Sequence, residues 1–204
     1  MTAPPLAGRG TPPNASATRG GDLASIVWAL GLLALFVGLR ANFSHPWLNM
    51  DEGMPMAVSQ AMTRRGVLDP DWAFTVENPP SHQYNFYLYN IVAHGVLRLT
   101  AGLHVSPYPT LRVLNLMFQL AALALTLDAL RRIGIGRFSI ALAGVLIAVA
   151  PGLVQDTGLV RPESFLYLLS ALFVWTLALP LSGRWRIPLL IAAALAVGTL
   201  ESRR

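Results

Sequence analysis

The chain alternates between long apolar runs and shorter polar connections, without the regular period of an amphipathic helix or strand. Uninterrupted runs of this kind predict helices that cross a membrane. The clearest runs are residues 23–39, 111–130, 138–150, 165–181 and 187–200. We therefore predict an all-α fold, a polytopic helical membrane protein with about five transmembrane helices.

Residues 40–110 form a long polar region between the first two of these runs. Within it, residues 54–65 predict a short helix, and residues 84–103 are apolar enough to form another. Aromatic residues gather at the start of the 84–103 stretch, and Arg98 lies near its end. We expect this stretch to be a juxtamembrane helix in the membrane interface, with the Arg98 side chain reaching toward water. A full transmembrane span over the same residues is the alternative.

The positions of the arginines predict the orientation. Residues 131–137 contain three arginines and residues 184–186 contain two, whereas the connection around Asp156 contains one. Arginine-rich connections stay in the cytoplasm. We therefore expect residues 131–137 inside, and both the 40–110 region and Asp156 outside. If the ambiguous stretch crossed the membrane instead, the bilayer would separate Asp51 from Asp156.

Residues 1–22 are rich in Pro, Gly, Ala, Ser and Thr, a composition that cannot bury a core. They predict a disordered cytoplasmic tail, and residues 23–204 predict a transmembrane domain with residues 40–110 as its external loop. The first apolar run is longer than the core of a typical signal peptide, and no small-residue cleavage site follows it. We expect a retained anchor, a cytoplasmic N-terminus and a place in the bacterial plasma membrane.

Composition excludes several other classes of protein. Hydrophobic residues make up 54% of the chain and charged residues 12%, and the mean hydropathy is +0.52. The chain contains arginine but no lysine, so no lysine can act as a base or form a Schiff base. The absence of cysteine excludes disulfides, thiolate catalysis and cysteine-ligated zinc. The net charge of +5 comes from arginines that flank apolar runs, which argues against nucleic-acid binding.

The acidic residues near the ends of the apolar runs are the candidates for chemistry. Asp51 and Glu52 follow the first run, and Asp156 lies between two later runs. Ionisable groups at a membrane boundary commonly have a function. Asp51 can act as a general base toward an acceptor, or can bind a divalent metal ion together with Asp156. Helix capping or a solvated loop charge is the alternative for each of these acids.

Arg161 and Glu163 follow Asp156 closely and open the next apolar run. A guanidinium fork matches the oxygens of a phosphate, so Arg161 is a candidate substrate-binding residue, with Glu163 beside it. The alternative is that Arg161 pairs with one of the neighbouring acids. Asn78 and His82 form a further candidate binding turn, in which His82 donates to a phosphate or a sugar hydroxyl. An interfacial polar role is the alternative for His82.

Three short motifs occur in a characteristic order: MDEG at residues 50–53, ENPP at 77–80 and LVRPE at 159–163. In this order and spacing they resemble the GT-C superfamily of membrane glycosyltransferases. The most similar branches are those of the protein O-mannosyltransferases and the aminoarabinose transferases that modify lipid A. The resemblance covers about residues 25–200 and corresponds to the N-terminal portion of a longer family architecture.

The resemblance implies a helical membrane domain whose catalytic acid, Asp51, lies in the first large external loop. It assigns Asp156 to a second acidic site, and implies a polyprenyl-phosphate-linked sugar as donor and an acceptor on the external membrane face. Partners would then be this lipid-linked donor, membrane lipids and a missing C-terminal half. Two departures stand out: Asn78 takes a place where relatives can carry a basic residue, and relatives contain many more spans.

Two further hypotheses remain open at this point. The chain could be a non-catalytic multi-pass membrane protein, such as a transporter subunit or an assembly factor, or it could be an inactive truncation. A transport path predicts a buried line of polar groups along the spans. Residues 111–130 and 165–181 offer few such groups, with Asp128 as the exception near one end.

Overall fold

The computed structural model describes residues 15–40, 50–66, 87–157 and 160–179, with positions 187, 190, 191 and 194 beyond them. Within these residues the regular structure is helical and no strand occurs, which confirms the all-α class for the described part. The elements are α1 (Ala15–Arg40), α2 (Met50–Arg65), α4 (Tyr87–Thr100), the 3-10 turn η2 (Ala101–Leu103), α5 (Pro107–Arg132), α6 (Arg137–Val149), α7 (Pro151–Thr157) and α8 (Glu163–Ala178).

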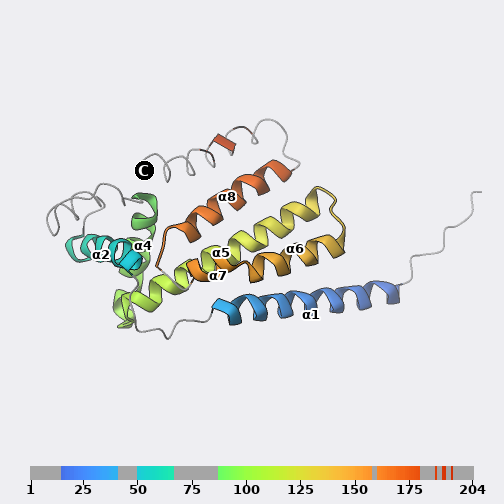
Figure 1. Cartoon of the computed structure of the whole chain (residues 1–204), viewed down its shortest axis with the longest axis horizontal. Coiled ribbons are helices and arrows are strands. Elements are labelled where there is room, and N and C mark those ends of the chain that lie inside the picture. Colours follow the sequence, from blue (N-terminus) through green and yellow to red (C-terminus); the bar gives the residue numbers. More distant parts are fainter. Residues whose placement is uncertain are drawn as a thin grey trace, which may run out of the picture.

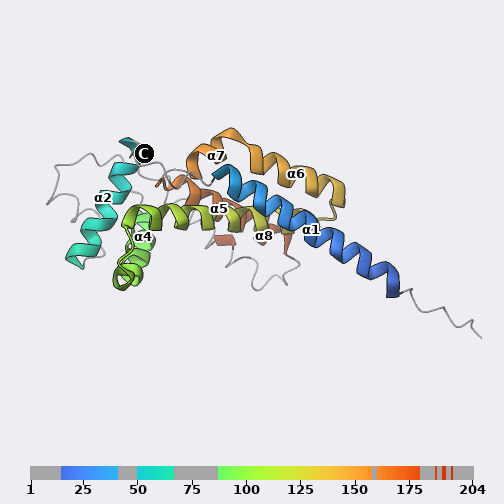
Figure 2. The ribbon, with the colours of Figure 1, turned by 90° about the horizontal axis from the view of Figure 1, so that it is seen from below.

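Four helices run along the long axis of the molecule: α1, α5, α6 and α8 (Figures 1 and 2). Helix α5 occupies the centre and makes its most extensive contact with α8. Helices α2 and α4 pack against each other at one end of this bundle, and Figure 2 shows both running across its axis. The chain therefore forms a longitudinal bundle with a crosswise helix pair at one end.

Helix α5 has clear sequence signals at both of its ends. Pro107 takes its first position, where a missing backbone N–H costs nothing because that group would have no partner within the helix. At the other end Gly134 adopts a φ of 84°, and its N–H and that of Ile135 donate to the carbonyls of Arg131 and Leu130. This pattern is a Schellman motif, which turns the chain from α5 toward α6.

Two clusters of buried apolar side chains hold the bundle together. The first joins α4, α5 and α8, and its rings include Phe165, which lies 4.9 Å from Phe118 and 6.5 Å from Tyr89, centroid to centroid. The second joins α1, α5 and α6 around Phe36. At Gly144 of α6, an added Cβ would come within 2.9 Å of a Leu32 methyl, so glycine permits the close approach of α1.

Among the described residues, α5 alone is both long enough and apolar enough to cross a membrane. It has 26 residues and a mean hydropathy of 1.8 over its best window, and its length is about 39 Å, against about 30 Å of hydrocarbon. The other apolar helices are shorter, namely Ala24–Arg40, Arg137–Val149 and Glu163–Ala178. The expected five spans are therefore not established, and the firm result is an all-helical chain with one span-length apolar helix.

Several boundaries differ from those predicted. Helix α1 begins at Ala15, inside the segment 1–22 that was expected to be a disordered tail. Helix α2 begins at Met50 rather than at residue 54. Pro55 lies inside the helix and does not mark its start. Positions 187–200 are described only at isolated residues, so the last predicted span lies largely outside the described part of the chain.

The ambiguous stretch 84–103 forms α4 and η2. Helix α4 contains 14 residues, or about 21 Å, which is too short to cross the hydrocarbon core. Length alone does not separate α4 from α6, which has 13 residues. Helix α4 lies across the bundle instead of along it, as an interfacial helix would, and its place in a membrane stays a prediction.

Candidate functional site

The helices that carry the predicted acids lie away from the turn between α5 and α6: α2 lies at one end of the bundle, and α7 lies beside the middle of α5. Asp51 and Glu52 lie in the first turn of α2, and Asp156 lies in the last turn of α7, one connection before α8 (Figures 1 and 2). We call the part of the bundle formed by α2, α4, α7 and the first turn of α8 the site end. The turn between α5 and α6 lies at the opposite end.

The structure places all three of these acids on helices, although the sequence predicted loops for them. Asp156 belongs to α7 because Pro151 starts a new helix directly after the break at Ala150. Asn78 and His82, the predicted binding turn, lie outside the described residues. Their roles therefore stay predictions.

The segment that carries Arg161 is connected to α4 through one buried amide. The Asn115 side chain on α5 is fully buried; its Nδ2 donates to the Arg161 carbonyl at 3.0 Å. The Tyr89 hydroxyl of α4 donates to Asn115 Oδ1 at 3.1 Å. Asn115 thus fixes the backbone before α8 relative to α4, at the residue that carries the half-buried Arg161 side chain.

Glu163 lies in the first turn of α8, where the helix dipole favours a negative charge. Its Oε2 atom is buried and accepts no hydrogen bond from the described part of the protein. A buried acceptor without a donor costs about 1–3 kcal/mol. Glu163 therefore offers an acceptor to a ligand hydroxyl, at the end of the bundle where the sequence predicts substrate binding.

A line of polar side chains on α5 was not predicted from the sequence. Arg112, Asn115 and Gln119 are spaced by three and four residues, which places them on one face of the helix, and all three are buried. We call this line the polar seam. Arg112 donates to the Tyr108 hydroxyl one turn away, and its guanidinium lies 4.0 Å from the Tyr108 ring centroid. The seam occupies the half of α5 nearest the site end.

Gln119 connects the seam to the helices on either side. Its Nε2 donates to Ser164 Oγ of α8 at 3.2 Å, and its Oε1 accepts from Arg40 Nε of α1 at 3.1 Å. Arg40 is only 1% exposed, and its Nη1 also donates to the Ala148 carbonyl near the end of α6 at 2.7 Å. One arginine therefore joins α1, α5 and α6 where these helices approach the site end.

The signal for the polar seam was present in the sequence. Polar residues at intervals of three and four share one face of a helix, and on a membrane helix such a face turns toward the bundle interior. What the sequence lacked was the identity of their partners, since Arg40 and Ser164 are 79 and 45 positions away from Gln119.

Helix α2 is positioned by polar contacts with α4. The Thr63 hydroxyl and His94 Nδ1 are 3.1 Å apart, and Ser59 Oγ donates to Asn90 Oδ1 at 3.4 Å. His94 is buried, and this burial, with a smaller contribution from the Arg98 charge, holds the pKa of His94 below its ordinary value. The neutral imidazole is thus the form that the packed α2–α4 pair favours.

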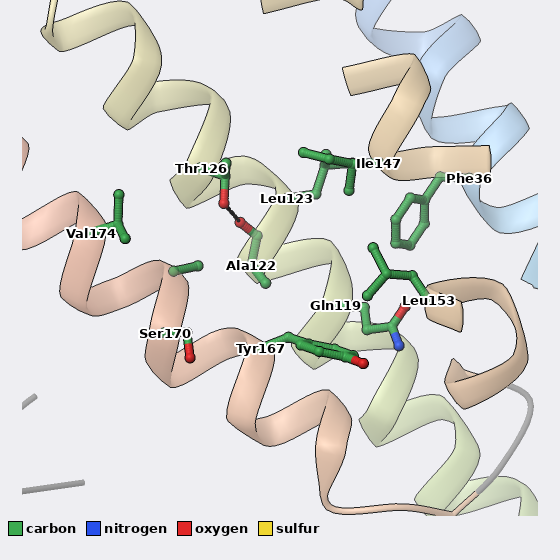
Figure 3. Close-up of a pocket in the computed structure, with 11 residues that line it drawn as sticks. Phe36, Gln119, Ala122, Leu123, Thr126, Ile147, Leu153, Tyr167, Ser170 and Val174 are labelled. Carbon is green, nitrogen blue, oxygen red and sulfur yellow. Dashed lines mark hydrogen bonds between the residues drawn. The ribbon is translucent and has the colours of Figure 1, made fainter. Parts of the chain in front are cut away.

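A cavity of about 300 Å³ lies beside the polar seam, between α5 and α8 and reaching α1, α6 and α7 (Figure 3). Gln119 and Tyr167 face one another near one end of it, and Thr126 and Val174 lie toward the other. Most of its walls are apolar, and further lining residues are Phe36, Leu123, Leu153 and Ser170. Such a space suits a hydrocarbon chain better than a sugar.

Within the described residues no group of three or more His, Asp or Glu side chains is placed to hold a metal ion. A metal site built from Asp51 and Asp156 therefore stays a prediction. Comparison of the chain with protein-family models, with curated proteins and with solved structures finds no match. The resemblance to the GT-C glycosyltransferases accordingly rests on the sequence motifs alone.

Proposed function

We propose that the chain is a polytopic integral membrane protein and a glycosyltransferase or a part of one. It would transfer a sugar from a polyprenyl-phosphate-linked donor to an acceptor on the external membrane face. One observation carries the proposal: the helices bearing Asp51 and Asp156 both lie away from the arginine-rich turn 131–137, α2 at the far end of the bundle and α7 beside the middle of α5. By the positive-inside rule, that turn would face the cytoplasm and the acids would face outside.

The outer surface of the bundle supports a position in the membrane. Large apolar side chains are exposed along the length of α1 and α6, far beyond the scattered residues that a soluble monomer exposes. Those on α1 include Ile26, Leu30 and Leu33, and those on α6 include Phe138, Leu142 and Leu146. Lipid tails would cover these side chains without an energetic cost.

Each candidate residue has a distinct role in this proposal. Asp51 orients and deprotonates the acceptor hydroxyl, with Glu52 adjacent, and Asp156 provides the second acid. Arg161 binds the donor phosphate, and Glu163 accepts a hydrogen bond from a sugar hydroxyl. Asn78 and His82 would contribute from the external loop. A divalent cation could bind to the carboxylate oxygens of Asp51 and Asp156, and no step of the proposal depends on it.

The second candidate function is a non-catalytic multi-pass membrane protein, which the buried polar seam favours. The seam, however, ends at Gln119, and Asn115 and Gln119 bond to side chains of the neighbouring helices α4 and α8. Farther along α5, the Thr126 hydroxyl donates to the Ala122 carbonyl of its own helix. The described polar groups therefore form a connection between helices and not a path through the bundle, which leaves an assembly role as the stronger form of this alternative.

Cysteine labelling tests the shared compartment, because the chain contains no natural cysteine. Single variants Asp51→Cys and Asp156→Cys should react with a membrane-impermeant maleimide added outside intact cells. Ser139→Cys, beside the arginine-rich turn, is the matched control and should react only after the membrane is opened. Labelling of just one of the two acid positions from outside would exclude a site that contains both.

A transfer assay tests the chemistry separately. Membranes containing the chain receive a radiolabelled polyprenyl-phosphate sugar, and lipid-free labelled product is measured. Asp51→Asn should lower the rate by about 100- to 10,000-fold, the range for loss of a general base. Asp71→Asn, another acid of the 40–110 region, should leave the rate unchanged. Equal rates for the wild-type chain and Asp51→Asn would overturn the catalytic assignment.

A further inference from the structure

The end of the bundle opposite the site end combines exposed cations with exposed apolar side chains. We call it the turn end, and it consists of residues 128–138. Arg131 has 72% of its side chain exposed, and Arg137 is exposed at the start of α6. Between and beside them, Ile133, Ile135 and Phe138 are also exposed, Phe138 at 82%.

The acid of the turn end is satisfied within the chain. Asp128 Oδ1 accepts from Arg131 Nε and Nη2 at 3.1 and 2.7 Å. Its Oδ2 accepts from Arg132 Nε at 2.5 Å and from Trp175 Nε1 of α8 at 2.8 Å. A carboxylate with four donors has no capacity left for an external cation, so the turn end presents positive charge outward.

The backbone of the turn end is satisfied as well. The Schellman motif at Gly134 supplies donors to the Leu130 and Arg131 carbonyls, so these carbonyls do not need an arginine side chain to cap α5. Arg131 gives two N–H groups to Asp128 and keeps the others toward solvent, and Arg137 opens α6 where no acid occupies the first turn. Both guanidinium groups are therefore placed to bind an external anion.

We infer that the turn end is a binding site for anionic phospholipid headgroups, with phosphate oxygens on Arg131 and Arg137 and acyl chains against Ile133, Ile135 and Phe138. Charge complementarity selects an anion, and the interleaved apolar side chains select one that carries hydrocarbon. This inference rests on the membrane position in the proposed function, and not on glycosyl transfer. The site is separate from α2 and α7, the helices that carry the predicted acids, because both lie away from the turn end.

Native mass spectrometry of the purified full chain in nonionic detergent tests this site, with equimolar phosphatidylglycerol and phosphatidylcholine added. The wild-type chain should retain phosphatidylglycerol in preference to phosphatidylcholine. Arg137→Gln should lower that preference about fivefold at low salt, since one arginine near a headgroup contributes about 1 kcal/mol. Removing Arg131 as well should bring the loss to the order of tenfold or more. Phe138→Ser should lower retention of both lipids, because both use the apolar contact.

Arg64→Gln, which removes an exposed arginine from α2, is the matched control and should retain the wild-type preference. Equal losses in Arg64→Gln and Arg137→Gln, or no preference in the wild-type chain, would overturn the inference. So would displacement of the lipid by millimolar inorganic phosphate, because it would indicate a site for free phosphate. A chain that carbonate extracts from membranes would instead refute the membrane position itself, so the two failures are distinguishable.

Discussion

The two ends of the bundle use the same residue type in opposite ways. Near the site end, Arg40 and Arg112 are buried: Arg40 donates to an amide of α5 and a carbonyl of α6, and Arg112 donates to the Tyr108 hydroxyl of its own helix. At the turn end, Arg131 and Arg137 remain exposed beside apolar side chains. A buried arginine is used to fix the chain around it, whereas an exposed arginine can still bind an external anion. The arginines near the site end are therefore suited to hold candidate catalytic groups in place. Those of the turn end are suited to contact a surface outside the protein.

The largest expected effect comes from removing the buried arginine of the site end. Arg40→Met should lower the free energy of unfolding by about 2–4 kcal/mol, because Gln119 and the Ala148 carbonyl lose their donor without gaining water. Thermal unfolding in detergent, followed by circular dichroism, measures this. Arg131→Met at the turn end is the control and should change stability little. Comparable losses in both variants would remove the distinction between the ends.

Gln119 sharpens the comparison within α5 itself. Gln119→Leu keeps the side-chain volume similar but leaves Arg40 and Ser164 without their shared partner, so we expect a loss of about 1–3 kcal/mol. Thr126→Val, farther along the same helix, removes a hydroxyl that bonds only to its own backbone and should cost much less. Chemical denaturation of both variants compares them. If the threonine variant were the less stable, the seam would not be the connection described.

The amide that positions Arg161 should show coupling to α4. Tyr89→Phe removes the donor to Asn115 Oδ1 and should cost about 0.5–1.5 kcal/mol. In a double-mutant cycle with Asn115→Ala, part of this cost should disappear, because the two substitutions remove the same hydrogen bond. Strict additivity of the two losses would show that the contact contributes nothing to stability.

The smallest effect concerns pH at the crosswise helices. Because the pKa of His94 is lowered on folding, the unfolded chain binds a proton more readily than the folded one. The stabilising contribution of neutral His94 is therefore complete above about pH 6.5 and declines as the pH falls below that value. Unfolding temperatures measured between pH 7.5 and 5 should fall more in the wild-type chain than in His94→Gln. Arg98→Gln should reduce the decline, since the Arg98 charge contributes to the shift.

The sequence anticipated the helices far better than their polar contacts. The apolar runs predicted α5, α6 and α8 to within a few residues, because in these helices the signal is local composition. The start of α2 was missed because Pro55 reads as a helix boundary, although the helix tolerates it one turn after Asp51. Asp156 was expected in a gap because Pro151 and Gly152 resemble a turn, whereas Pro151 begins a helix.

The candidate site could be predicted only in part. The positions of the arginines predicted a common side for Asp51 and Asp156, and this stays a prediction; the helices that carry them both lie away from the arginine-rich turn. The roles of Asn115 and Gln119 were not predicted, because a single polar residue in an apolar run acquires meaning only from a partner on another helix. Such partners are set by packing between distant segments, which a sequence pattern of one helix does not contain.

The contact between Arg40 and the last carbonyls of α6 has a consequence for biogenesis. The break at Ala150 releases backbone acceptors that a lipid environment would leave without donors. The guanidinium that serves Ala148 and Ile147 was synthesised more than a hundred positions earlier. The bend between α6 and α7 can therefore be completed only after the first helix has docked beside α5 and α6, which makes the N-terminal segment a template for the segments that follow it.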